Sequence, residues 1–125
     1  MARKLLEEPD VDAVAIGVDL RTVKTVMASS DLAGRVLEQE EFPTDPDVKK
    51  TLVKIVDCAQ RLIGKTRGAI EGMGISVPGV VDPEKGTLYI PHFNWRDAPI
   101  AETLTRATSL PVTIDNDARR GALFL

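Results

Sequence analysis

An almost unbroken apolar run near the N-terminus constrains the fold more than any other feature of the sequence. Residues 13–20 read AVAIGVDL, and the single charged residue, Asp19, stands next to the end of the run. Continuous apolar runs of this length are typical of strands that are buried on both faces, as in parallel sheets. The sequence therefore predicts a sheet with this strand in its interior.

Two further strand candidates and a helix follow this run. Residues 24–29 and 35–42 have strand character and are joined by the turn Asp31-Leu32-Ala33-Gly34, so the first three strands form a meander. From Asp45 to Gly64 apolar residues recur at helical spacing, with a proline suited to the first turn and a glycine suited to the end. This spacing predicts one amphipathic helix of about five turns.

The rest of the chain alternates between strands and helices. Strands are expected at residues 70–77, 87–90 and 111–115, and helices at residues 99–107 and after Asn116-Asp117. A meander followed by strand and helix in alternation indicates an α/β fold. We expect the helices to cover both faces of the sheet.

Length and composition exclude several classes of protein. The 125 residues predict one domain at residues 13–125, preceded by a charged leading segment or linker at residues 1–12. The 16 basic and 19 acidic residues give a net charge of -3 without clustering, which argues against nucleic-acid binding by this segment. One cysteine, Cys58, allows neither a disulfide framework nor a cysteine-based zinc site within the chain, and it indicates a reducing cytoplasm. No signal peptide or membrane span is expected.

Polar residues stand where three of the predicted strands end. They are Asp19, Pro78-Gly79 and Asn116-Asp117. Ligands of open α/β sheets bind beyond the carboxyl ends of the strands, so these positions predict a binding crevice. Each motif also has a plainer interpretation, because Asn and Asp are favoured helix caps and Pro-Gly is a common turn.

Three stretches together resemble the ROK family of bacterial sugar kinases and repressors in order and spacing. They are GMGISVPGVVDPEKG at residues 72–86, IPHFNWRDAPIAETL at residues 90–104 and LPVTIDNDA at residues 110–118. The resemblance covers nearly all of residues 13–125. It implies the N-terminal lobe of an actin-like ATPase, or ribonuclease H-like, fold in which a mixed sheet is flanked by helices. The second lobe of that fold is expected to lie beyond Leu125.

The resemblance also implies a set of sugar-binding residues. In this family the aspartate of the Asn-Asp pair is the catalytic base and the asparagine binds the sugar, which corresponds to Asp117 and Asn116. The Pro-Gly turn lines the same pocket, which corresponds to Gly79 with Val80 beside it. A loop residue that reaches the sugar corresponds to His92, for which a solvated loop side chain is the alternative. The nearby Trp95 is expected to anchor its loop against the core rather than to stack on sugar.

The sequence departs from the family at the phosphate-binding turn after the first strand. ROK kinases have Asp-x-Gly-Gly-Thr-Lys there, whereas residues 19–24 read Asp19-Leu20-Arg21-Thr22-Val23-Lys24. Side chains therefore occupy the space of both glycines, where backbone N–H groups would cradle ATP phosphates. Arg21 offers a charge to an anion, although an exposed hairpin residue is the preferred interpretation.

This departure favours a sensor over an enzyme. We expect the sugar-sensing lobe of a ROK transcriptional regulator, which binds a hexose or amino sugar without phosphorylating it. The alternatives are the N-terminal lobe of an ATP-dependent ROK glucokinase or hexokinase, and a lone domain kept for assembly. No cofactor is expected within the chain, ATP and magnesium would be needed only by a kinase, and the family's zinc site lies in the second lobe. DNA would be bound only through a helix-turn-helix that this chain lacks, and the full-length protein is expected to be a homo-oligomer.

Overall fold

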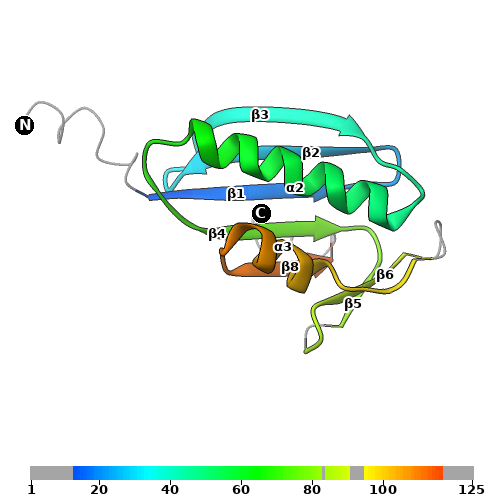
Figure 1. The fold of residues 1–125 in the computed structure, drawn as a ribbon. Coiled ribbons are helices and arrows are strands. Elements are labelled where there is room, and N and C mark those ends of the chain that lie inside the picture. Colours follow the sequence, from blue (N-terminus) through cyan, green and yellow to red (C-terminus); the bar gives the residue numbers. More distant parts are fainter. Residues whose placement is uncertain (1–12, 83, 91–94, 117–125) are drawn as a thin grey trace, which may run out of the picture.

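The computed structural model describes residues 13–82, 84–90 and 95–116, which form two sheets and two helices (Figure 1). The elements in chain order are β1 (Ala13–Leu20), β2 (Lys24–Asp31), β3 (Val36–Pro43), α2 (Val48–Lys65), β4 (Ala69–Val77), β5 (Val80–Asp82), β6 (Thr87–Ile90), β7 (Trp95–Ala98), α3 (Ile100–Thr108) and β8 (Val112–Asn116). Neither helix among these residues is both long enough and apolar enough to span a membrane.

The larger sheet has five strands in the order β3-β2-β1-β4-β8. β1 and β3 both pair antiparallel with β2, which confirms the predicted meander. On its other side β1 pairs parallel with β4, and β4 pairs parallel with β8. The sheet is therefore mixed, and the apolar run at residues 13–20 forms its central strand, as the sequence predicted.

Both described helices lie on the same face of this sheet (Figure 1). Side chains alternate along β1, so that its even-numbered residues are buried against the helices while its odd-numbered ones face the opposite side. We predicted helices on both faces. The predicted helix after Asn116-Asp117 lies outside the described residues, so cover on the second face stays a prediction.

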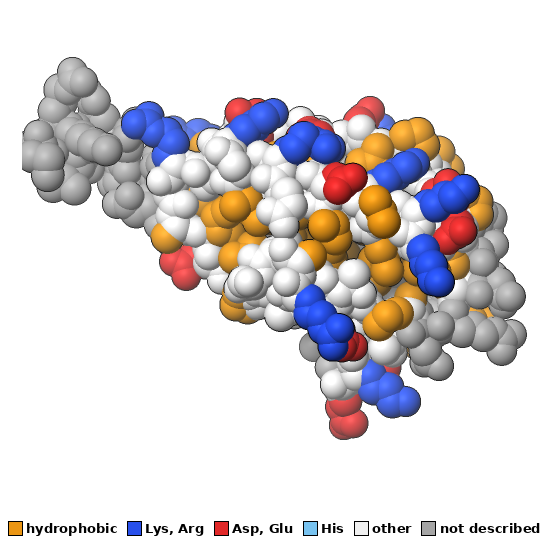
Figure 2. Space-filling model, viewed as in Figure 1, with side chains coloured by type: hydrophobic (Ala, Val, Ile, Leu, Met, Phe, Trp, Pro, Cys, Tyr) orange, Lys and Arg blue, Asp and Glu red, His pale blue; other side chains and the backbone are white. Residues whose placement is uncertain are grey.

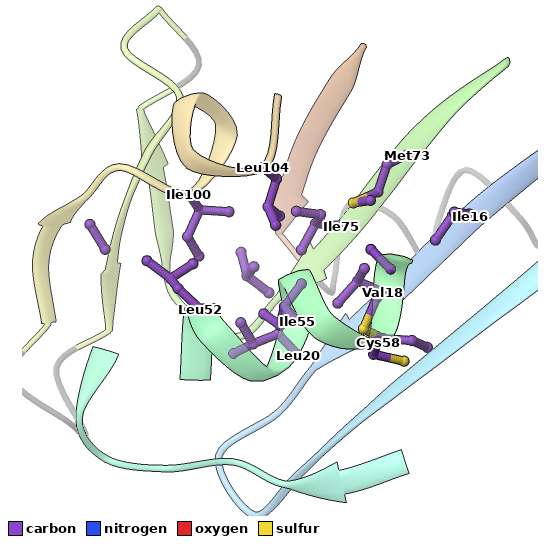
Figure 3. Close-up of a cluster of buried hydrophobic side chains, with 14 of the residues drawn as sticks. Ile16, Val18, Leu20, Leu52, Ile55, Cys58, Met73, Ile75, Ile100 and Leu104 are labelled. Carbon is purple, nitrogen blue, oxygen red and sulfur yellow. The ribbon is translucent and has the colours of Figure 1, made fainter. Parts of the chain in front are cut away.

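The core forms between the sheet and the two helices (Figure 3). α2 begins at Asp47, whose side chain caps the helix by accepting hydrogen bonds from the N–H groups of Lys49 and Lys50. Its apolar face buries residues including Ile55, and Leu104 of α3 packs into the same cluster. Cys58 is fully buried in this cluster, where it packs as a small apolar side chain.

A smaller antiparallel sheet, in the order β5-β6-β7, extends from the end of β4. The strand β7 was not predicted. Its first residue, Trp95, is only 3% exposed, and its indole Nε1 donates a hydrogen bond of 2.6 Å to the carbonyl oxygen of Pro46. The expectation that Trp95 anchors its segment against the core is therefore confirmed.

Candidate functional site at the carboxyl ends of the parallel strands

Three polar side chains form a row across the carboxyl ends of β1, β4 and β8. Asp19 pairs with Ser76, and Ser76 pairs with Asp115. Their neighbours Val18 and Val77 point toward the helices, so the three polar side chains share the opposite face of the sheet. Sequence reasoning missed Ser76, because a serine near the end of a strand carries no signal of its own. The register of the parallel strands is what places it between two carboxylates.

The predicted site residues Gly79 and Asn116 meet at the end of β4 and β8. The side-chain Nδ2 of Asn116 donates a hydrogen bond of 2.7 Å to the carbonyl oxygen of Gly79, which lies 37 residues earlier in the chain. Asn116 pairs in the sheet with Val77, which points toward the helices. Asn116 and the row of Asp19, Ser76 and Asp115 therefore lie on opposite faces of the same sheet edge.

Gly79 lacks a side chain for a reason that the structure makes clear. Any Cβ atom at this position would overlap the backbone carbonyl oxygen of Tyr89 in β6 and would crowd the side chain of Ile90. The close approach here is to the neighbouring strand of the small sheet, and it leaves the Gly79 carbonyl free to accept the bond from Asn116.

Two ion pairs lie at the turn between β1 and β2, one within the turn and one at the start of β2. Arg21 Nε donates to Asp19 Oδ2 at 2.9 Å, and Lys24 Nζ lies 3.3 Å from Glu41 Oε2. Val23 stands at the tip with 80% of its side chain exposed. Asp19 Oδ1 is buried, and among the described residues it has no hydrogen-bond partner.

The backbone of this turn differs from an anion-binding nest. Such nests alternate right- and left-handed residues so that successive N–H groups converge on one anion. None of residues 21–23 has a positive φ, whereas Gly34 and Gly86 elsewhere in the described chain do. The residues that replace the two glycines therefore keep ordinary right-handed or extended backbone.

The remaining predicted site residues are placed only in part. Val80 begins β5 directly after Gly79 and has 64% of its side chain exposed. His92 and Asp117 lie outside the described residues. A separate groove of about 570 Å³ runs between the β5–β6 hairpin, α3 and β8, and among the residues described along it none is a predicted sugar-binding residue. The described part of the predicted site is therefore the corner formed by Gly79, Val80 and Asn116.

The motifs and this geometry indicate a family, and comparison with protein families shows which one. The model of the ROK family matches residues 15–124, which is most of the chain. The chain belongs to the ROK family. The mixed sheet with its two helices is the actin-like ATPase fold of the ROK sugar kinases.

ROK proteins of two kinds are similar to this chain. A glucokinase from Halalkalibacterium halodurans is 33% identical over 114 residues, covering 86% of this chain and 34% of the relative. A xylose repressor from Caldicellulosiruptor bescii is 32% identical over 120 residues, covering 91% of this chain and 30% of the relative. A ROK hexokinase from Thermus thermophilus has a crystal structure that superposes with a TM-score of 0.76 at 28% identity, over 88% of this chain and 37% of that one. The chain therefore spans about a third of the length of its relatives.

Proposed function

We propose that this chain is the N-terminal, sugar-sensing lobe of a ROK transcriptional regulator, which binds a hexose or amino sugar without phosphorylating it. The relatives do not distinguish a sensor from a kinase, because a repressor and a glucokinase match this chain almost equally well. The proposal therefore rests on the site, and above all on the turn between β1 and β2.

The observation that carries the proposal is the contrast between this turn and an anion-binding nest. Its side chains fill the space that the two glycines of the kinase motif leave open, and none of residues 21–23 has a positive φ. Arg21 is bound to Asp19, so its charge is already balanced within the chain. ATP and magnesium would have no backbone cradle here.

The sugar side of the site is better preserved. The bond from Asn116 to Gly79 holds the end of β8 against the end of β4. The family resemblance assigns sugar contacts to Gly79, Val80, His92, Asn116 and Asp117. A carboxylate can accept a hydrogen bond from a sugar hydroxyl without any phosphoryl donor, so binding can persist where phosphoryl transfer does not.

The alternative is the N-terminal lobe of a ROK glucokinase or hexokinase, and the glucokinase relative favours it. In that case Asp117 would be the base that takes the proton of the attacking sugar hydroxyl. The two proposals differ in one outcome. The kinase requires ATP-dependent phosphorylation of a sugar by the full-length protein, and the sensor requires sugar binding alone.

The sensor proposal also implies partners for the full-length protein. It would bind DNA through a helix-turn-helix domain of the full-length protein, act in the cytoplasm and assemble as a homo-oligomer. The xylose repressor among the relatives supports this part of the proposal. Specificity for one sugar would depend also on residues of the second lobe.

Substitution of Asp117 tests the proposed sugar contact. Asp117→Asn keeps the shape and removes the charge, so calorimetry on the full-length protein should show sugar affinity lower by about 1.5 to 3 kcal/mol, the scale of a charged hydrogen bond. Asp117→Ala is the companion variant. If it lowers the free energy of unfolding by about 1 kcal/mol or more while sugar affinity is unchanged, Asp117 is a helix cap and not a sugar ligand.

A further inference from the structure

Tyr89 exposes an aromatic ring beside the corner that holds the predicted sugar contacts. Its side chain is 38% exposed, and in the antiparallel pair of β5 and β6 it lies directly opposite Val80. The Cβ atoms of two residues in that position are about 5 Å apart on the same face of the sheet. Tyr89 and Val80 therefore form one exposed apolar pair, and Val80 is itself a predicted sugar contact.

The backbone fixes where this ring stands relative to the corner. The carbonyl oxygen of Tyr89 occupies the position that a Cβ atom of Gly79 would need, so β6 runs directly against the corner. The next residue, Ile90, is 2% exposed and belongs to the core, and Tyr89 therefore points the opposite way. Val81, which follows Val80, likewise packs against the core. The exposed pair is thus set by the ladder between β5 and β6.

Other aromatic and apolar surfaces of the described residues fit a sugar less well. Trp95 is buried, and its indole N–H is bonded to the carbonyl of Pro46. Phe42 packs against the core from β3. An open apolar hollow lies between α2 and α3 (Figure 2), but its lining includes neither an aromatic residue nor a predicted sugar contact. Among the described residues, Tyr89 is therefore the aromatic side chain that a sugar at the corner could contact.

A sugar ring needs two kinds of partner. Its hydroxyl groups form hydrogen bonds at the rim, whereas its C–H groups give the ring an apolar face. Binding sites for small molecules combine aromatic or apolar side chains with a few polar groups that fix the orientation. The corner has both kinds, because the amide of Asn116 is polar and the pair of Val80 and Tyr89 is apolar. A sugar that contacts Val80 is within reach of the tyrosine ring.

We propose that Tyr89 is a further sugar-binding residue, whose ring packs against the C–H face of a pyranose bound at the corner. The flat ring offers a large contact area at a small cost in side-chain entropy, while the phenol hydroxyl stays in water. This inference rests on the proposed function, because it requires a sugar at the corner. It is independent of the choice between sensor and kinase, since the packing of a ring on a sugar requires no phosphoryl donor.

Calorimetry on the full-length protein tests the contact, with D-glucose, D-mannose, D-galactose and their 2-acetamido derivatives as probes. Tyr89→Ala should weaken binding of the tightest probe about tenfold or more, because the contact area of the ring is lost. Tyr89→Phe keeps the ring and should bind that probe within about threefold of the original. Leu32→Ala is the matched control, because Leu32 is an exposed apolar side chain, at 70%, in the turn between β2 and β3. This control should bind as the unmodified protein does.

Proton NMR of the same probe shows directly whether the sugar lies over the ring. The ring current should shift the C–H protons of the bound sugar upfield with the unmodified protein and with Tyr89→Phe. The shift should be absent with Tyr89→Ala. Circular dichroism confirms that each variant is folded.

The outcomes separate this inference from the proposed function. Equal binding of the probe by the unmodified protein and by Tyr89→Ala would overturn the inference alone, and the pair of Val80 and Tyr89 would then only stabilise the ladder between β5 and β6. If no probe binds the unmodified protein, the proposed function and the inference both fail. Phosphorylation of a probe whose binding depends on the ring would contradict the sensor and support the inference.

Discussion

The end of β1 and the joined ends of β4 and β8 lie at the same edge of one sheet, but they are built in different ways. The turn after β1 is held by an ion pair between Arg21 and Asp19, whose side chains are 60% and 40% exposed. The corner between β4 and β8 is held by the Asn116 bond to the Gly79 carbonyl and by backbone packing that leaves no room for a side chain. Exposed ion pairs can be replaced with little loss of stability. A side chain added where backbone is closely packed destabilises the fold.

Under the proposed function, this difference gives a physical reason why phosphate binding could be lost from the lobe while sugar binding remains. Residues of the turn can be replaced without disturbing the sheet, so the capacity to hold phosphates can disappear while the corner remains. We therefore expect substitutions at the corner to affect stability strongly and substitutions at the turn to affect it little. The predictions below follow that order.

Gly79→Ala should produce the largest effect. The added methyl group would overlap the carbonyl oxygen of Tyr89, and neither strand can move without disturbing the small sheet, so we expect the free energy of unfolding to fall by about 2 to 3 kcal/mol. Gly17→Ala in β1 is the matched control, since nothing lies within 4 Å of its Cβ position, and it should change stability by about 1 kcal/mol or less. Urea denaturation of both variants makes the comparison. Equal effects of the two substitutions would show that Gly79 is not held by backbone packing.

Asn116→Asp should have the next largest effect. It replaces the donor Nδ2 with an oxygen that faces the carbonyl oxygen of Gly79, so we expect a loss of about 2 kcal/mol from an unmade bond and the repulsion between two acceptors. Asn116→Ala removes the bond without the repulsion and should lose about 1 kcal/mol. Thermal unfolding of both variants tests this order, and the aspartate variant should have the lower midpoint. An aspartate variant as stable as the alanine variant would mean that the bond does not hold the corner together.

Arg61→Gln should have a smaller effect that depends on pH. The hydrogen bonds from Arg61 hold the pKa of Glu40 below its usual value of 4.5. A carboxylate whose pKa is lowered in the folded state contributes stability above its unfolded pKa and loses it as the pH falls through the folded pKa. The unmodified chain and the variant should therefore differ in stability near pH 7 and converge as the pH falls below about 4. A difference that is constant from pH 7 to pH 3 would contradict this role of Glu40.

Arg21→Gln at the turn should have the smallest effect. Its ion pair with Asp19 is exposed on both sides, so we expect the free energy of unfolding to change by about 0.5 kcal/mol or less. Sugar affinity of the full-length protein should be unchanged, because Arg21 is not among the proposed sugar contacts. A loss of stability as large as that of Asn116→Ala would remove the contrast between turn and corner.

Much of the larger sheet could be predicted because its signals are local. The run at residues 13–20 correctly predicted the central strand, and the helical spacing after Asp45 correctly predicted α2. The same run does not reveal what covers the second face of the sheet. Its outward positions are Ala13, Ala15 and Gly17, and small residues extend an apolar run without showing what packs against them.

The features that were missed depend on contacts that no local pattern records. β7 has the sequence WRDA, which shows no strand periodicity, and its pairing with β6 makes it a strand. The place of Ser76 between Asp19 and Asp115 comes from the register of three strands. The rule that ligands bind at the carboxyl ends of parallel strands did predict that Gly79 and Asn116 would lie at one edge. It could not predict the hydrogen bond between them.

Calorimetry of the full-length protein with ATP and magnesium present tests the central claim most directly. Hexoses and amino sugars would be injected one at a time. A sensor that binds without phosphorylating should give, for its sugar, a heat pulse that returns to the baseline and saturates with added sugar. A kinase should give a sustained heat flow that lasts until the sugar or the ATP is consumed. Sustained heat flow that corresponds to about one turnover per second or more would contradict the proposal that this lobe senses sugar without phosphorylating it.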